Sequence, residues 1–191
     1  MDSGRLEAFS DGVLAIIITI MVLEMKAPEE SGFDALFMIL PVFLSYLVSF
    51  IYIGTYWNNH HHLFQITEQV NGKVLWSNLH LLFWLSLIPF ATSWIGENHI
   101  ESWPVAFYGI ILLMSGFAYN LLEYKIIENH PDDFTLNQVR RGSKKGITSI
   151  ALYLSGIAVS FIMPGLGIAC YILVLILWLV PDRKIENALE K

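Results

Sequence analysis

Six runs of mainly apolar residues, joined by short polar segments, leave this chain few ways to fold. A helix needs roughly 20 apolar residues to cross the hydrocarbon core of a bilayer, and a helix satisfies its own backbone hydrogen bonds within lipid. The sequence therefore predicts an all-α membrane protein with six transmembrane helices in a single domain over residues 1–191. The predicted spans cover residues 6–25, 35–57, 74–94, 105–124, 147–163 and 166–180.

The composition supports a membrane protein and argues against several other classes. Only 15% of the residues are charged, against about 25% in an average soluble domain. The net charge of -6, with no basic tract, argues against nucleic-acid binding. The single Cys170 excludes an intramolecular disulfide. No small-residue cleavage site follows the first run, so we expect that run to be a retained span rather than a signal peptide.

The positions of the basic residues predict the orientation. If the N-terminus is cytoplasmic and six spans follow, only Lys26 of the 11 lysines and arginines falls outside. This asymmetry is what the positive-inside rule describes, and it places both termini in the cytoplasm. The outer loops are acidic, which could concentrate cations or simply keep those loops hydrated.

A specific motif opens the first apolar run: Arg5-Leu6-Glu7-Ala8-Phe9-Ser10-Asp11-Gly12-Val13. The pattern R-x-x-x-F-S-D-G-V resembles the bacterial members of the endolysosomal potassium channel family, also called the transmembrane protein 175 family. The resemblance implies a potassium-preferring cation channel. It also implies a homotetramer around a central pore lined by the first helix, in the plasma membrane of a bacterium or archaeon.

The first helix carries an apolar stripe. At about 100° per residue, one face presents Phe9, Gly12, Ile16, Thr19, Ile20 and Leu23. Such a stripe usually faces lipid or a protein core, but around a fourfold axis it would form stacked apolar rings that gate by dewetting. The resemblance assigns the constriction to this stripe, and we expect Ile16 at the narrowest point, with Ile20 and Leu23 behind it.

Thr19 is the candidate selectivity residue. The chain contains no T-V-G-Y-G segment, so a carbonyl filter of the usual potassium-channel type is absent from the sequence. The resemblance implies a ring of Thr19 hydroxyls that contributes to a modest selectivity. The simpler role for a threonine in a membrane helix is a hydrogen bond to the carbonyl four residues earlier, here Ala15.

The polar residues of the motif predict a packing network behind the pore helix. Asp11 points away from the apolar stripe, and a carboxylate within a membrane should be paired. Arg5 cannot easily reach Asp11 along the same face. We therefore expect Arg5, Phe9, Ser10 and Asp11 to be held by residues of the second and third helices, for which the candidates are Trp57, His60, His61, Trp76, Asn78 and His80.

Other site chemistries fit the sequence less well. His60, His61 and His62 diverge on a helix and cannot converge on one metal ion, so we expect no metal site. No nucleophile-and-base motif of an enzyme appears, and we expect no cofactor beyond the permeant K⁺. The alternative function is a secondary ion transporter, because Pro89 could break the third helix.

Overall fold

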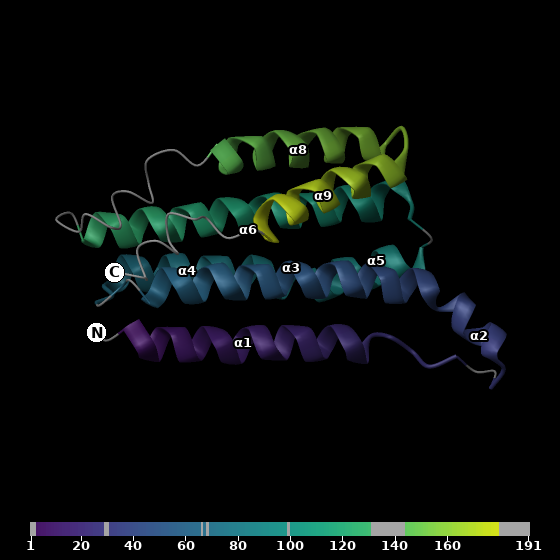
Figure 1. The fold of residues 1–191 in the computed structure, drawn as a ribbon, viewed down its shortest axis with the longest axis horizontal. Helices are drawn as coiled ribbons and strands as arrows, with labels where there is room; N and C mark the ends of the chain where they lie inside the picture. Colours follow the sequence, from purple (N-terminus) through teal and green to yellow (C-terminus); the bar gives the residue numbers. More distant parts are fainter. Residues whose placement is uncertain are drawn as a thin grey trace.

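The computed structural model describes residues 3–28, 31–65, 67, 69–98, 100–130 and 144–179, and the described elements are helices that lie roughly parallel (Figure 1). Their bounds are α1 Ser3–Leu23, α2 Phe33–Met38, α3 Leu40–Gln65, α4 Gly72–Ser86, α5 Ile88–Glu97, α6 Ser102–Asn129, α8 Lys144–Ser160 and α9 Pro164–Leu179.

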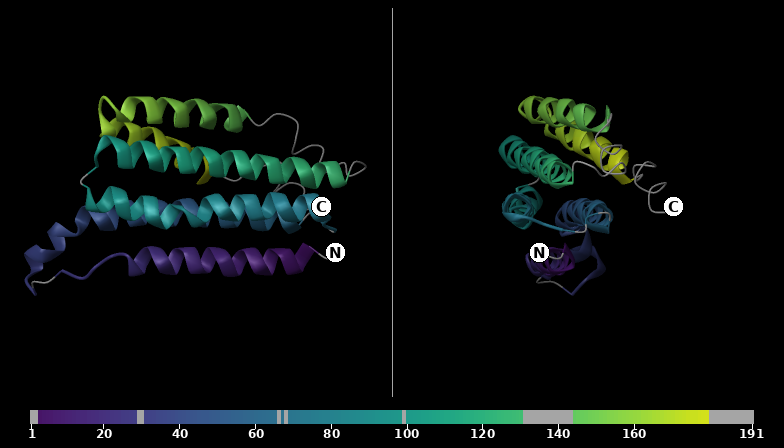
Figure 2. Two further views of the ribbon diagram at one scale, coloured as in Figure 1. Left: turned by 180° about the vertical axis from the view of Figure 1, so that it is seen from behind. Right: turned by 90° about the vertical axis from the view of Figure 1, so that its left-hand side faces the viewer.

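The helices form a stack with α1 at one edge and α8 at the other. Figure 2 shows α1 beside α3 and the α4–α5 pair, α6 beyond them, and α8 with α9 at the far side. The packing agrees, because α1 contacts α3, α4 and α5, whereas α8 contacts α6 and α9. The helix that carries the motif is therefore covered by the rest of the subunit on one side only.

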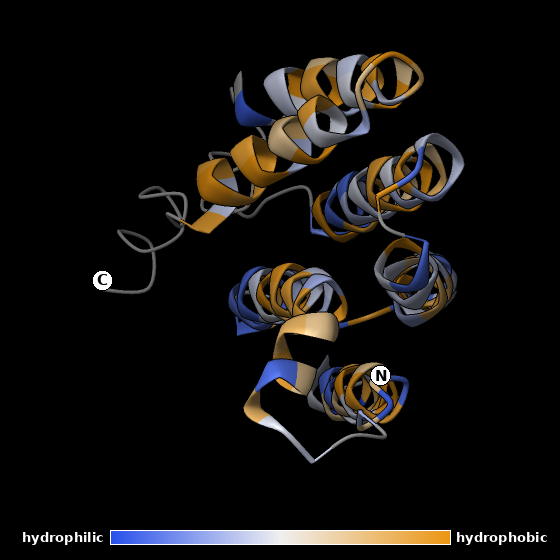
Figure 3. Ribbon diagram, turned by 90° about the vertical axis from the view of Figure 1, so that its right-hand side faces the viewer, coloured by the Kyte–Doolittle hydropathy of each residue, from blue (hydrophilic) through white to orange (hydrophobic). Residues whose placement is uncertain are grey.

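Within the residues that the structure describes, four stretches are long and apolar enough to cross a membrane: Ser3–Leu23, Leu40–Gln65, Gly72–Glu97 and Ser102–Asn129. The apolar helices α8 and α9, of 17 and 16 residues, are shorter and measure about 24–26 Å at 1.5 Å per residue. Hydrophobic residues recur along the helices (Figure 3), and many large ones, such as Phe83, Phe117 and Leu154, are exposed on the outer surface of the subunit. Outward apolar faces are what a bilayer requires and what water penalises.

Several bounds differ from the sequence prediction, and the second span begins as a separate short helix, α2, before α3. The second span was expected to end at Trp57, but α3 continues to Gln65, because a polar stretch at the end of a membrane helix can remain helical in the interface. The third span divides at Leu87 into α4 and α5, because Pro89 has no N–H for the Leu85 carbonyl. The bend keeps most backbone bonds: Leu87 N–H donates to Trp84 O at 3.2 Å, and Ala91 N–H donates to Leu87 O at 3.2 Å.

Glycines allow α9 to pack tightly against both α6 and α8. A Cβ added to Gly109 would lie 2.0 Å from the Tyr171 hydroxyl oxygen, and one added to Gly156 would lie 2.5 Å from the Tyr171 ring. Small residues at helix crossings permit this close approach in membranes. The Tyr171 hydroxyl in turn donates to Val105 O at 3.2 Å, which ties α9 to α6.

Charged residues that the structure describes lie toward the two ends of the helix stack. The end at which α1 begins and α6 finishes holds Lys125, whose ammonium lies 2.7 Å from the Glu128 carboxylate (Figure 1). The other end holds Lys26, 3.8 Å from Glu97. Charges at the ends and apolar residues between them are the pattern of an integral membrane protein.

Candidate functional site

Helix α1 has a buried face and an exposed face. The buried face, which packs on α3, α4 and α5, consists of Leu6, Ser10, Leu14, Ile17 and Met21. The residues recur at intervals of three or four, which places them on one side of the helix. The opposite face carries the stripe that the sequence predicts, and the subunit does not cover it.

The predicted ring residues lie on that exposed face. Ile16 is 59% exposed, Ile20 is 42% exposed and Leu23 is 78% exposed. Phe9 is also exposed, and a Cβ added to Gly12 would meet no atom within 4 Å. The structure therefore leaves an apolar surface along most of α1 open to lipid or to another subunit.

Thr19 makes the local hydrogen bonds that a helical threonine is expected to make. Its hydroxyl lies 2.8 Å from Ile16 O and 3.1 Å from Ala15 O. These bonds use the hydroxyl proton and leave the oxygen lone pairs exposed on the striped face, where they can accept from water or face a cation.

A buried chain of hydrogen bonds joins α3 and α4 to the back of α1. His60 Nε2–H donates to Asn78 Oδ1 at 2.8 Å, and Asn78 Nδ2–H donates to Ser10 Oγ at 2.8 Å. The Ser10 hydroxyl then donates to Leu6 O at 2.9 Å. All three side chains are buried, and this order of donors requires the Nε2–H tautomer of His60. The chain fixes the rotation of α1 about its own axis.

A second polar cluster holds the start of α1 against the end of α3. Trp57 Nε1–H donates to Asp11 Oδ1 at 3.0 Å, and the Trp57 ring stacks on His61 with centroids 6.0 Å apart. His61 Nδ1 lies 2.6 Å from Glu7 Oε1. Sequence reasoning missed Glu7, although it lies four residues before Asp11 in the same motif and so shares its helix face.

The remaining candidates of the predicted network lie apart from these clusters. Trp76 is 75% exposed. Trp84 Nε1–H donates to His80 Nε2 at 2.9 Å within α4, so His80 has a local partner. Arg5 and Phe9 are exposed on α1. Among the residues that the structure describes, no three His, Cys, Asp or Glu side chains are grouped as metal ligands would be.

Comparison with known proteins gives consistent matches. The family model described as the endosomal/lysosomal potassium channel TMEM175 matches residues 5–89. A potassium channel of Chryseobacterium sp. (strain P1-3) is 56% identical over 191 residues, covering 100% of both chains. A potassium channel of Chamaesiphon minutus is 31% identical, over 90% of this chain and 91% of the other.

Two further matches extend the comparison to a solved structure and to animals. The crystal structure of a lysosomal potassium-selective channel TMEM175 homolog from Chamaesiphon minutus superposes with a TM-score of 0.79 at 29% identity, covering 92% of this chain and 95% of that one. The endosomal/lysosomal proton channel TMEM175 of Gallus gallus is 32% identical over 56% of this chain and 25% of its own length.

The match with the Chryseobacterium protein covers both chains from end to end, and the structural match covers nearly all of the fold. The first-helix motif lies within the part that the family model matches. The chain therefore belongs to the family of the endosomal/lysosomal potassium channel TMEM175, a family of channels rather than enzymes.

Proposed function

We propose that this chain forms a homotetrameric, potassium-preferring cation channel of the cell membrane, with α1 of every subunit lining a central pore. The relatives named potassium channel support the permeant ion. One observation of the structure supports the pore: α1 lies at the edge of its subunit with an uncovered apolar stripe (Figure 2). An exposed face on the helix that carries the family motif is available to meet its symmetry mates.

In this proposal Ile16, Ile20 and Leu23 form three successive apolar rings. The residues are spaced by four and three, so they rise about 6 Å and then 4.5 Å along the helix. A narrow passage with such walls excludes water, and therefore ions, until it widens. Ile16 stands nearest the polar start of the helix and is assigned the narrowest ring.

Thr19 is assigned the selectivity role, because its oxygen is the polar atom within the ring segment. The two backbone contacts at 2.8 and 3.1 Å hold the hydroxyl in one rotamer. A ring of hydroxyl oxygens can replace part of the hydration shell of K⁺, but it offers fewer oxygens than a carbonyl filter. Modest selectivity for K⁺ follows, and the mechanism requires no resident cofactor.

The hydrogen bonds behind α1 serve as its support. Ser10 is held by Asn78, and Asp11 is held by Trp57 at 3.0 Å. Both partners lie on the side of α1 away from the stripe, so they orient the stripe without entering the pore. In this proposal the polar residues of the motif fix the direction in which the ring residues point. They do not contact ions themselves.

The proposed topology has six crossings with both termini in the cytoplasm. The end of the stack that holds Arg5, Lys73 and Lys125 becomes the cytoplasmic end, and the end that holds Lys26 and Glu97 becomes the outer end. The excess of basic residues sets this orientation. The shorter helices α8 and α9, at about 24–26 Å, fall a few ångströms short of the hydrocarbon core, and the bilayer accommodates them by thinning locally.

A secondary ion transporter is the second candidate, and the bend at Leu87 is the observation that favours it. Transporter sites use unwound helices whose free carbonyls hold the coupling ion. Here, however, the Leu87 N–H and carbonyl are both bonded at 3.2 Å to neighbours in α4 and α5. The bend therefore offers little free backbone to an ion, and a channel fits better.

Potassium flux into liposomes that contain the purified protein tests the proposal. A channel gives K⁺ flux that follows the imposed voltage and needs no gradient of a second ion. Flux that appears only when a second ion gradient is imposed would indicate a transporter. Empty liposomes and liposomes with heat-denatured protein provide the baseline.

A further inference from the structure

A half-open pocket lies between α3, α6, α8 and α9, on the side of the subunit away from α1. It encloses about 50 Å³ at its centre, or about 570 Å³ with the space out to its mouth. Its walls are mainly aromatic and aliphatic, and six of the lining residues define it: Tyr56, Gly116, Phe117, Ile150, Tyr153 and Trp178. A pocket of this size and lining is suited to an apolar ligand with few polar contacts.

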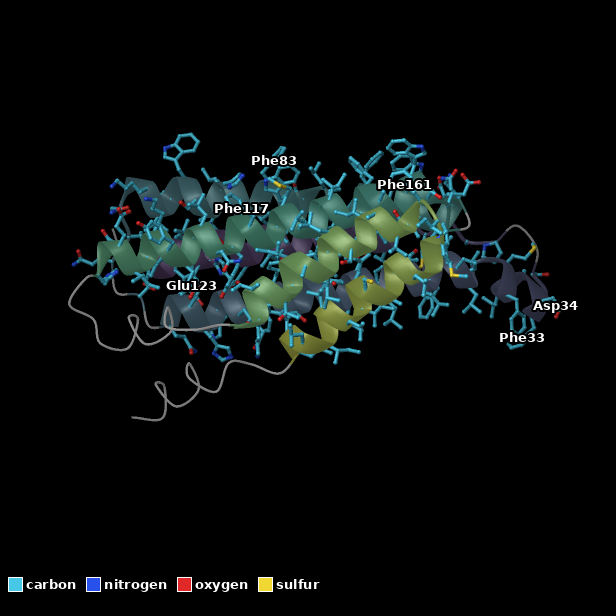
Figure 4. The ribbon with its side chains drawn as sticks, turned by 90° about the horizontal axis from the view of Figure 1, so that it is seen from above. Phe33, Asp34, Phe83, Phe117, Glu123 and Phe161 are labelled. Carbon is cyan, nitrogen blue, oxygen red and sulfur yellow. The ribbon has the colours of Figure 1, made fainter. Side chains whose placement is uncertain are left out.

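The mouth of the pocket opens on the outer surface of the subunit. Phe117 and Ile150, which line it, are 57% and 46% exposed. Figure 4 looks onto this side and shows Phe117 partway along α6. If the copies of α1 meet on the pore axis, α8 at the opposite edge of the stack faces the surrounding bilayer (Figure 2). This step rests on the proposed function.

The pocket lining also contains a few polar side chains, among them Tyr56, Asn59 and Ser149. The Tyr56 hydroxyl faces the space beside Gly116, because a Cβ added there would lie 3.8 Å from its oxygen. A polar group in an apolar site needs a hydrogen-bond partner. The central space has room for a few water molecules, which can hydrogen-bond to these polar groups. The aromatic outer part offers water no such partner, so an apolar group suits it.

The end of the pocket nearer the proposed cytoplasmic side carries a positive charge. Lys145 Nζ lies 6.0 Å from the centre of the Trp178 ring, and Trp178 lines the pocket. An ammonium at the membrane interface attracts the phosphate of a lipid head group. The Lys145 ammonium is thus placed to meet a phosphate head group, and the apolar mouth is placed to meet an acyl chain.

We propose that the pocket binds one acyl chain of a phospholipid from the cytoplasmic leaflet, with the head group beside Lys145. The chain enters between Phe117 and Ile150 and lies against Trp178. The site is separate from the pore stripe, because it lies on the α8 side of the stack. The bound acyl chain contacts both α8 and α6 and stabilises their packing.

Quenching of Trp178 fluorescence by lipids brominated at mid-chain tests this proposal. The Trp178 contribution is the difference between the wild type and Trp178→Phe, measured in vesicles of brominated and unbrominated phosphatidylcholine. We expect strong quenching of that contribution. Gly116→Leu should remove most of the quenching, because Gly116 lines the pocket and a Cβ there meets no atom closer than 3.8 Å, the distance to Tyr56 Oη and to the Tyr153 ring.

Gly165→Leu is the matched control, because a Cβ added there meets nothing within 4 Å, and Gly165 lies in the first turn of α9 and is not part of the pocket lining. Should Gly116→Leu fail to fold, Gly146→Leu fills the pocket from α8, with its Cβ 3.9 Å from Asn120 Oδ1. Equal quenching in the filled and control variants would overturn the proposal.

Absence of Trp178 quenching in the wild type would also overturn the lipid proposal. Crosslinking between subunits that carry Ile150→Cys would then show that a second subunit covers the mouth of the pocket. Potassium flux measured on the same vesicles keeps the two proposals distinct. Flux without quenching rejects the lipid site alone. Quenching without flux rejects the channel and leaves the occupied pocket standing.

Discussion

At the scale of single residues, the polar groups of the motif act on the back of α1. Asn78 links two elements to the helix, because it accepts from His60 and donates to Ser10 at 2.8 Å each. These bonds lie where no water competes, so an orphaned partner would be costly. The ring residues on the front of α1 have no such constraint within the subunit.

Asn78→Leu should destabilise the protein, because it removes both bonds and leaves His60 and Ser10 without their partner. We expect a loss of about 1–3 kcal/mol and a lower Tm, measured by thermal unfolding in detergent. Asn98→Leu is the control, because the Asn98 side chain donates to Trp94 O, four residues earlier at the end of α5, and joins no other helix in the described part of the chain. An unchanged Tm in Asn78→Leu would show that the chain of bonds does not support α1.

Ile16→Ser should raise ion conductance and weaken the preference for K⁺, because a small polar side chain lets water into the narrowest ring. Single-channel current in planar bilayers measures both. Leu154→Ser is the matched control, since Leu154 is comparably exposed on α8 and lies far from the stripe. Currents unaltered by Ile16→Ser, and by the same change at Ile20 and Leu23, would reject the pore assignment.

At the scale of elements, α1 divides its residues between a face that packs and a face that stays open. Ile17 and Met21 are each 2% exposed, whereas their neighbours Ile16 and Ile20 are 59% and 42% exposed. Both faces are apolar, so hydrophobicity alone could not tell them apart. The buried face of α1 differs from the exposed face because it contacts α3, α4 and α5.

Cysteine substitution along α1 should reproduce this division. In a Cys170→Ala background, Ile16→Cys and Ile20→Cys should react with a water-soluble thiol reagent and lose current. Ile17→Cys and Met21→Cys should not react, because those positions are buried. The readout is the modification rate followed by current. Equal reaction rates at all four positions would contradict a pore formed by one face.

Much of the fold could be predicted from the sequence, because apolar runs of span length admit few structures. The extension of α3 to Gln65 could not, since polar residues in a helix end resemble those of a loop. Pro89 predicted a break in the third span. The sequence did not show that the backbone at the bend would keep most of its hydrogen bonds.

The hydrogen-bonded network behind α1 was also only partly predictable from the sequence. The positions of Ser10 and Asp11 on the back of α1 follow from helix periodicity. Their partners Asn78 and Trp57 could be named only within a set of candidates, because tertiary contacts select them. Trp76 and His80 were equally plausible in sequence, yet the turn of α4 directs them elsewhere.

At the scale of the whole molecule, the position of α1 at the edge of the stack requires an assembly for the proposed function. One subunit encloses no central path in the described part of the chain. In the proposed channel the uncovered stripe of α1 meets its symmetry mates around an axis, and that arrangement would place α8, at the opposite edge of the stack, outermost (Figure 2).

Native mass spectrometry of the detergent-solubilised protein should therefore give a complex of four times the chain mass. Charged replacements on the α1 stripe, such as Ile20→Asp, should weaken that complex, because four carboxylates would be forced together. Leu154→Asp on α8 provides the control. A monomer in mild detergent and in nanodiscs would contradict the assembly.

The position of α1 in the assembled protein is the central claim, and electron cryomicroscopy of the protein in nanodiscs measures it directly. The account predicts four copies of α1 around the symmetry axis, with Ile16 side chains closest to one another. Density that placed α1 at the perimeter against lipid, with other helices on the axis, would contradict it.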